Sequence, residues 1–142
     1  MQLLIRSYDR LIGRPLIETD DHPGGVSQAL FEVPFFVAYH NTEEDPVLTC
    51  GNQTALDLFE MEWDEFISTP SRFTAETPER AKRERLLGAV RTNGFIDDFS
   101  GIRISKTGKR FLIKQATVWN LIDESGSHVG QAATFEGWEP LS

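Results

Sequence analysis

Residues 93–135 read NGFIDDFSGIRISKTGKRFLIKQATVWNLIDESGSHVGQAATF, and this stretch decides the fold. From Phe95 onward, apolar and polar residues alternate with a period of two, which predicts extended strands. Two turn-forming runs interrupt the alternation, KTGK at residues 106–109 and DESG at residues 123–126. Short glycine-containing turns join antiparallel neighbours, so the stretch predicts three hairpin-linked strands in a meander.

The middle strand of this meander, about residues 109–122, exceeds the usual length of about five or six residues. We therefore expect it to be twisted and central in the sheet. Its odd positions form the more apolar face: Phe111, Ile113, Gln115, Thr117, Trp119 and Leu121. Its even positions, which include Leu112, Ala116 and Val118, form an opposite face that is too apolar to be wholly exposed.

The chain before the meander predicts two more strands and several helices. Apolar runs at residues 35–39 and 47–50 flank an acidic turn, as in a hairpin. Residues 55–67 fit two short helices, and residues 77–93 fit a longer one with Thr77 as its N-cap and Asn93-Gly94 at its end. Residues 3–12 fit a short amphipathic helix, which the turn-forming residues 18–25 separate from the rest.

These elements predict an α+β fold. It comprises a five-stranded antiparallel sheet with several short helices and one longer helix on one face, plus the N-terminal amphipathic helix. We expect residues 1–25 to form that helix and a linker, and residues 26–142 to form the domain. A chain of 142 residues with 39% hydrophobic content is large enough for one packed core.

Composition argues against several classes of partner. The net charge of −8 has the wrong sign for binding nucleic acid or an anionic membrane directly. No apolar run approaches the length of a membrane span, and Arg6 and Asp9 come too early for a signal peptide. The single cysteine, Cys50, cannot form an internal disulfide, which favours a reducing compartment and a cytoplasmic protein.

Three segments of the chain carry a resemblance to a known family. Residues 93–101 (NGFIDDFSG), 116–120 (ATVWN) and 130–135 (GQAATF) resemble bacterial stand-alone proteins of the MEKHLA family, over about residues 26–140. That family is PAS-like (Per-ARNT-Sim), and it also occurs at the C-terminus of plant homeodomain-zipper transcription factors. The resemblance implies a PAS-type fold with a sensory or regulatory role. The plant proteins' DNA binding does not carry over, because the chain has no basic recognition helix.

The residues that hold cofactors in PAS domains have no counterpart here. The Gly-x-Asn-Cys-Arg-Phe-Leu-Gln motif of flavin-type photoreceptors is absent, and the helix over residues 78–93 lacks the histidine of haem-type domains. We expect neither cofactor, and we expect Cys50 to be an inert buried residue. His22, His40 and His128 lack metal-ligand spacing and are expected at the solvated surface, so no metal site is predicted.

No set of residues predicts catalysis, and we expect a protein that is not an enzyme. Asp97 and Asp98 are adjacent on a strand and should point to opposite faces, so they cannot share a proton. We expect one of them to point inward, where it ties down a backbone amide or binds a ligand.

Polar residues within the apolar sheet face are the best functional clue. A buried amide without a partner costs about 1–3 kcal/mol, so an inward Gln115 needs a neighbouring side chain, a water or a ligand. An apolar pocket with a few polar groups is typical of small-molecule sites. The candidate pocket residues are Gln115, Thr117, Trp119, Phe111, Gln131, Asp97 and Asn52.

Two functions therefore compete. In the first, a sensory domain binds a small, partly polar organic ligand between the sheet and the helices. In the second, a ligand-free module dimerises or binds a protein through the outer sheet face and the N-terminal helix. The candidate interface residues for this second function are Leu4, Tyr8, Leu11, Leu112 and Val118.

Overall fold

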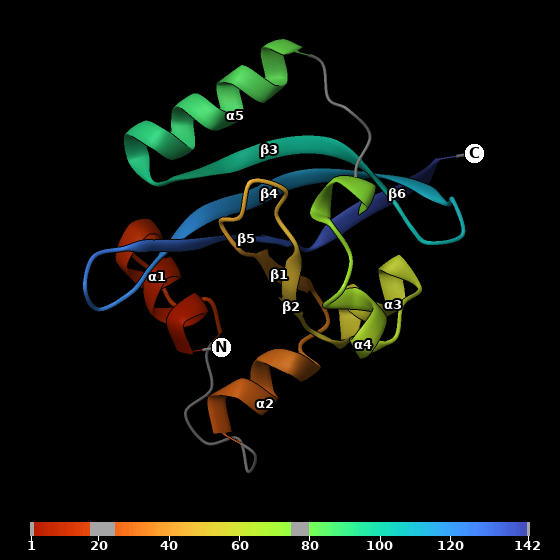
Figure 1. The fold of residues 1–142 in the computed structure, drawn as a ribbon, viewed down its shortest axis with the longest axis horizontal. Helices are drawn as coiled ribbons and strands as arrows, with labels where there is room; N and C mark the ends of the chain where they lie inside the picture. The colour runs from red at the N-terminus through yellow and green to blue at the C-terminus, as the bar shows by residue number, and fades with distance from the viewer. Residues whose placement is uncertain (1, 18–24, 75–79, 142) are drawn as a thin grey trace.

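The computed structural model describes residues 2–17, 25–74 and 80–141 of the chain (Figure 1). The helices are α1 (Gln2–Ile12), α2 (Gly25–Glu32), α3 (Gln53–Phe59), α4 (Trp63–Phe66), a short 3₁₀ helix η1 (Ser71–Thr74) and α5 (Arg80–Asn93). The strands are β1 (Phe36–His40), β2 (Leu48–Gly51), β3 (Phe95–Ile104), β4 (Arg110–Ile122), β5 (His128–Phe135) and β6 (Gly137–Leu141). The predicted N-cap Thr77 lies outside the described residues.

The strands form one antiparallel sheet in the order β2-β1-β5-β4-β3. This confirms the predicted α+β fold and the meander of β3, β4 and β5. A sixth strand, β6, was not predicted; it follows β5 after a bend at Glu136 and pairs with the first half of β4. Thr117 pairs with Thr134 of β5 and Lys114 pairs with Gly137 of β6, so the two strands extend one another along β4.

Two register shifts interrupt the pairing of β3 with β4. Ile96 pairs with Val118 and Phe99 with Ala116, which places Asp97 and Asp98 together opposite Thr117. Gly101 then pairs with Ile113, which places Lys114 and Gln115 together opposite Ser100. Gln115 takes the left-handed backbone conformation, with φ of 50°. These two-against-one arrangements are β-bulges.

The bulge at Gln115 overturns the predicted facing of the long strand. We call the sheet face toward α3, α4 and α5 the inner face, and the face toward α1 the outer face. Phe111 and Ile113 lie in the core on the inner face, but beyond the bulge Ala116 and Val118 occupy that face. Trp119 and Leu121 belong to the core on the outer face. The prediction of one continuous odd-numbered face is therefore wrong, because one extra residue reverses all later side chains.

Helix α1 covers part of the outer face. Leu4 and Tyr8 are buried there with Val37, Trp119 and Leu121, and the rings of Tyr8 and Trp119 meet edge to face with centroids 4.9 Å apart. Ser7 accepts a hydrogen bond from the Ile122 backbone amide at 3.3 Å. Leu30 of α2 belongs to the same outer-face core, so α1 and α2 lie on this face, while α3, α4 and α5 pack on the inner face. The helices thus cover both faces, not the single face expected for those of the domain.

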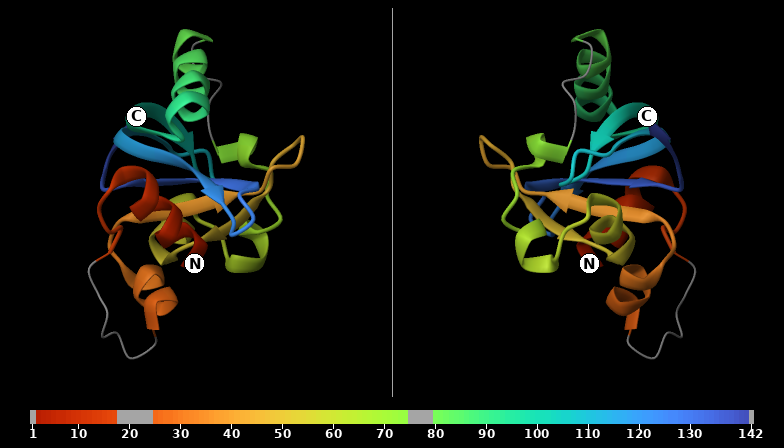
Figure 2. Two further views of the ribbon diagram at one scale, coloured as in Figure 1. Left: turned by 90° about the vertical axis from the view of Figure 1, so that its left-hand side faces the viewer. Right: turned by 90° about the vertical axis from the view of Figure 1, so that its right-hand side faces the viewer.

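The longest helix, α5, runs along β3 at the top of the molecule (Figure 1). Both side views show it on the far side of the sheet from α2 (Figure 2). Its last turn caps one end of the inner face, where the Val90 carbonyl accepts a hydrogen bond from Asn120 at 3.3 Å. None of the described helices is long and apolar enough to cross a membrane.

Candidate functional site

Two hollows lie on the two faces of the sheet. The first, the outer groove, lies between α1 with the segment after it and the junction of β5 with β6, and has a volume of about 880 Å³. The second, the inner pocket, lies between the inner face, η1 and α5, and has a volume of about 520 Å³. Both volumes fall in the range of about 300–1,000 Å³ that is usual for small-ligand sites, so the chemistry of the walls must distinguish them.

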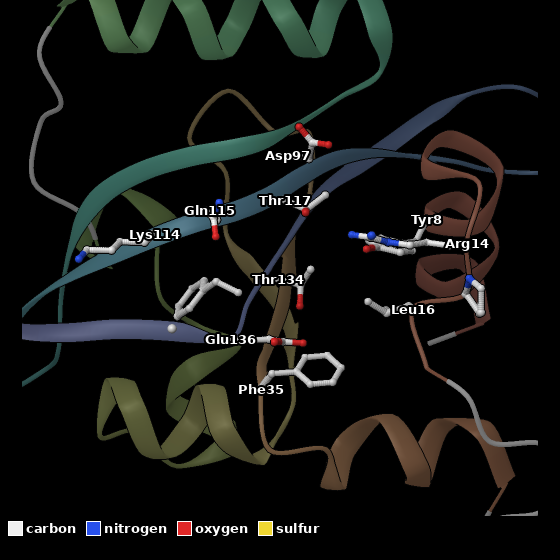
Figure 3. A pocket seen from close by; sticks show the side chains of 13 residues that line it. Tyr8, Arg14, Leu16, Phe35, Asp97, Lys114, Gln115, Thr117, Thr134 and Glu136 are labelled. Carbon is white, nitrogen blue, oxygen red and sulfur yellow. The ribbon is translucent and has the colours of Figure 1, made fainter.

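Three predicted pocket residues line the outer groove: Asp97, Gln115 and Thr117 (Figure 3). The other lining residues are Tyr8, Arg14, Pro15, Leu16, Phe35, Lys114, Thr134, Phe135, Glu136 and Gly137. Asp97, Gln115 and Glu136 are exposed. The prediction that the Gln115 side chain points inward is therefore wrong, because the bulge turns this side chain toward solvent.

Opposite charges balance one another in the outer groove. A hydrogen bond with Tyr8, together with the negative charges of Asp97 and Glu136, raises the pKa of Arg14. Lys114 forms an ion pair with Glu139, with Nζ 2.6 Å from Oε1. Groups that are paired and hydrated gain little from a ligand, because they already have partners in water or protein. The outer groove is thus the weaker candidate.

The inner pocket has mostly apolar walls. Strands β1, β4 and β5 contribute inward side chains that are buried or half-buried: Phe36, Ala38, Ile113, Val118, Ala133 and Phe135. Phe59 of α3 and Phe99 of β3 extend this surface. The rings of Phe36 and Phe135 stack with centroids 4.3 Å apart, which fixes the floor. Such a surface is suited to the apolar body of a small molecule.

Polar side chains stand at one end of this apolar surface. His40 of β1 and Gln131 of β5 are register partners, and both face inward. The His40 Nδ1 lies 2.8 Å from the Asn41 carbonyl, and because a carbonyl only accepts, Nδ1 carries the proton. The other ring nitrogen, Nε2, is on the side of Gln131, which also forms a hydrogen bond with this imidazole. Burial lowers the pKa of His40, although the hydrogen bonds with Asn41 and Gln131 oppose this effect. The imidazole is therefore neutral at pH 7.

Arg103 of β3 reaches the inner pocket from the other side. It faces inward because it pairs with Phe111, beyond the second bulge. Its guanidinium carbon lies 5.8 Å from the centroid of the Phe99 ring. Burial lowers the pKa of Arg103 to about 10, so the group stays charged at pH 7. A positive charge is thus held at the wall of an apolar hollow.

The rim of the inner pocket is built by η1 and the turn after β1. The Ser71 amide donates to the Pro46 carbonyl at 2.8 Å, and Val47 bridges to Pro70. Arg72 at this rim pairs with Asp45, with Nε 3.1 Å from Oδ1. The Thr74 hydroxyl donates to the Ser71 carbonyl at 2.7 Å. These contacts hold the rim against β2.

Several predicted site residues lie in neither hollow. Asn52 is fully buried and accepts hydrogen bonds from the Val37 and Ala55 amides at 3.2 and 3.1 Å, which makes it the N-cap of α3. Trp119 is fully buried in the core on the outer face, and Phe111 is buried in the core on the inner face. Only Gln131, of the predicted pocket residues, lines the inner pocket.

Two other expectations about charged and polar residues need correction. Asp97 and Asp98 do point to different sides, but both are exposed: Asp98 pairs with Arg85 of α5 at 2.7 Å, and Asp97 lines the outer groove. Neither points into the core. His40 is half-buried and inward-facing, and not a solvated surface residue as predicted. Its place at a strand end beside a turn concealed this orientation.

The proposed interface residues are distributed over both faces. Leu4, Tyr8 and Leu11 pack within the chain in the core on the outer face. Leu112 lies half-buried beside Glu139 of β6. Val118 faces the inner pocket, so its predicted place on the outer face is wrong. Over the described parts of the chain, no three His, Cys, Asp or Glu side chains come together as a metal site would require.

The sheet order, the helices over the inner face and the pocket between them define a PAS-type domain. The sequence model of the MEKHLA domain matches residues 1–140, so the chain belongs to the MEKHLA domain family. This confirms the resemblance drawn from the sequence, and the match includes α1. No curated protein matches the sequence.

Solved structures of PAS and light-oxygen-voltage (LOV) domains share the fold. An RNA-binding LOV receptor has a TM-score of 0.65 at 19% identity over 84% of this chain, which spans only 34% of that receptor. A PAS domain from Colwellia psychrerythraea has a TM-score of 0.61 at 13% identity, with 81% of this chain and 92% of that domain covered. The LOV domain of a blue-light activated histidine kinase from Erythrobacter litoralis has a TM-score of 0.60 at 15% identity, with 78% and 99% covered. At these identities the likeness concerns the fold alone.

A flavin is named for one of the similar LOV structures. The residues here do not fit a flavin site that reacts with a cysteine. Cys50, the single cysteine, lies on β2 and lines neither hollow. Burial raises the pKa of its thiol, which keeps it protonated and unreactive. The inner pocket therefore lacks, in its described lining, the thiol that such chemistry requires.

Proposed function

We propose that this MEKHLA domain is a sensory or regulatory module that binds a small, partly polar organic ligand in the inner pocket. The observation that carries the proposal is the inward, half-buried amide of Gln131 in a hollow of about 520 Å³ whose other strand-borne walls are mostly apolar. Small-ligand sites combine an apolar lining with a few placed polar groups. The fold is that of sensory PAS-type domains, which supports the same role.

The proposed activity is binding without chemistry. Two polar groups of the pocket are engaged in structural hydrogen bonds: His40 with the Asn41 carbonyl, and Thr74 with the Ser71 carbonyl. Because the Thr74 hydroxyl donates to a backbone carbonyl and not to a general base, it is not activated as a nucleophile. A sensor needs only a ligand that shifts the population of conformations.

The competing function, dimerisation through the outer face, has less support. Leu4 and Tyr8 are buried against Trp119 of the same chain, so their apolar surface is already used. A homodimer and a cytoplasmic location stay predictions, and neither is needed for ligand binding.

Mass spectrometry and a pocket-filling variant test the proposal. Native spectra of freshly purified protein should show a bound mass that denaturing spectra lack, or a small-molecule library should raise the melting temperature. Ala133→Phe adds a ring inside the inner pocket and should abolish both effects. Glu136→Phe is the matched control, because it adds a ring to the outer groove and should change neither. Effects lost in E136F and kept in A133F would place the ligand in the outer groove and contradict the proposal.

A further inference from the structure

The described lining of the inner pocket carries a charge imbalance. It includes two arginines, Arg72 and Arg103, and no aspartate or glutamate. The whole chain has 22 acidic and 14 basic residues, so a lining with only positive charges runs against its composition. The imbalance indicates that a ligand of this pocket would carry a negative charge.

The two arginines differ in what they contact. Arg72 is exposed, pairs with Asp45 at 3.1 Å and lies over the ring of Phe73 at 4.3 Å. Arg103 is half-buried, and its contact within the described residues is the Phe99 ring rather than a carboxylate. Of the two arginines, Arg103 is therefore the one whose positive charge is available to a ligand.

The backbone of β3 makes room for this guanidinium. Phe99, Gly101 and Arg103 share the inner face of the strand. A Cβ at Gly101 would lie 3.1 Å from the Phe99 ring and 3.7 Å from Arg103 Nη1, so the Arg103 side chain folds back over the glycine toward Phe99. A longer side chain at position 101 would occupy this path. The guanidinium thus lies along the pocket wall, where its N–H groups can reach an occupant.

A guanidinium in this position favours an anion. Removing a charge from water is costly unless a partner replaces the lost hydration, and arginine matches the two oxygens of a carboxylate with parallel hydrogen bonds. Phosphate monoesters carry about −1.5 to −2 charges at pH 7 and would call for more than one unpaired cation. A singly charged carboxylate matches Arg103, the arginine of the described lining for which no acidic partner is found among the described residues.

We infer that the inner pocket takes an organic monocarboxylate with a compact apolar body, and that Arg103 binds its carboxylate group. The inference rests on the proposed function, since it names the class of ligand for the same pocket. The aromatic and aliphatic walls formed by Phe36, Phe99 and Val118 would contact the apolar body. Gln131 of β5 and His40 of β1, on the other side of the pocket from Arg103, would contact any second polar group of the ligand.

Matched pairs of probes test the charge separately from the pocket. Benzoate and hexanoate are compared with their neutral amides, benzamide and hexanamide, and with phenyl phosphate, by NMR titration at pH 7. We expect each acid to bind the wild type about tenfold or more tightly than its amide, because the guanidinium forms stronger hydrogen bonds with a charged carboxylate than with a neutral amide. Arg103→Gln should remove this preference and leave amide binding in place. Arg103→Lys should restore part of it.

Two further variants make the result specific. Arg72→Gln is the matched control and should change the acid preference less than about fivefold, because this exposed arginine already has a partner. Arg103→Met keeps an apolar side chain against Phe99, and it replaces R103Q if that variant fails to fold.

The outcomes separate the two claims. Equal binding of acids and amides, an acid preference retained in R103Q and R103M, or tighter binding of phenyl phosphate than of benzoate would overturn the carboxylate assignment while leaving the pocket intact. Binding of none of the five probes would overturn the assignment as well. A co-purified mass that A133F removes would then still support the pocket itself.

Discussion

The Ser105 hydroxyl donates a hydrogen bond to Glu60, with Oγ 2.7 Å from Oε2. Glu60 is the C-cap of α3 in a left-handed conformation, with φ of 59°, and Ser105 directly follows β3 at the start of the hairpin to β4. Thr107 and Lys109 of the same hairpin also contact the carboxylate. One side chain therefore connects the helical layer to the sheet at the end of the long hairpin.

Stability should depend on the protonation of Glu60 in acid. Hydrogen bonds from Thr107, Ser105 and Lys109 lower the pKa of Glu60 from 4.5 to about 2. The unfolded chain takes up the proton first, so the stabilisation is complete above pH 4.5 and is lost as the pH falls toward 2. Urea unfolding at pH 7 and at pH 3 should show a smaller loss of stability for Glu60→Gln than for the wild type. An E60Q loss equal to that of the wild type would contradict this, and Glu62→Gln serves as an exposed control.

Replacement of Gln115 by glycine should stabilise the protein. Gln115 is not a glycine, yet it has φ of 50°, a conformation that costs an L-residue about 1–2 kcal/mol. Gln115→Gly removes this strain at an exposed bulge and should raise the free energy of unfolding by roughly 0.5–1 kcal/mol. Lys114→Gly, one residue earlier on the same strand, should lower it. The measurement is chemical denaturation, and a loss of stability in Q115G would show that the amide side chain contributes more than the strain costs.

The sequence predicted the meander because its turns and its period of two are local signals. The facing beyond Gln115 was not predictable from the same alternation, since a bulge adds one residue without disturbing either half of the pattern. The adjacent polar residues Lys114 and Gln115 are the signal that could have located it. Two exposed residues in succession are unexpected in a central strand unless it bulges.

The same limit explains which residues of the inner pocket were found. Gln131 was identified because it is polar within an apolar strand. Arg103 was missed because an arginine near a strand end is expected to be solvated, and its inward facing depends on two bulges between Ile96 and Gly101. His40 was missed because the sequence placed it beside a turn as a solvated residue, whereas it is the last residue of strand β1. Local patterns predicted the sheet, but long-range register decided the pocket.

Asn52 should be among the most important residues for stability. Its Oδ1 accepts hydrogen bonds from the Val37 and Ala55 amides, and its Nδ2 donates to the Phe35 carbonyl at 2.8 Å and to the Leu30 carbonyl at 3.3 Å. Asn52→Ala leaves these backbone groups without their partner in a fully buried site, at a cost of roughly 2–4 kcal/mol. Thermal and chemical unfolding measure the effect.

A matched control for Asn52 lies one residue further along the chain. Gln53 is exposed and bonds Asp57 on the same helix, so Gln53→Ala should cost less than about 0.5 kcal/mol. If N52A and Q53A were equally mild, buried water would have to replace the four contacts of Asn52.

The titration of His40 should report on Arg103. Burial is the main reason that the pKa of His40 lies below 6.5, and the positive charge of Arg103 is among the further causes. A folded pKa below the unfolded value means that stability is fully present above about pH 6.5 and falls as the pH drops through the folded pKa. NMR titration of the imidazole should therefore give a pKa below 6.5 in the wild type and a higher one in Arg103→Gln, because removing a nearby cation makes the imidazolium less unfavourable. Arg72→Gln should leave the value unchanged, since Arg72 pairs with Asp45 at the rim. If the pKa of His40 were the same in the wild type and in R103Q, Arg103 would not act on the end of the pocket formed by His40 and Gln131. A bound carboxylate could then contact either Arg103 or this pair, but not both.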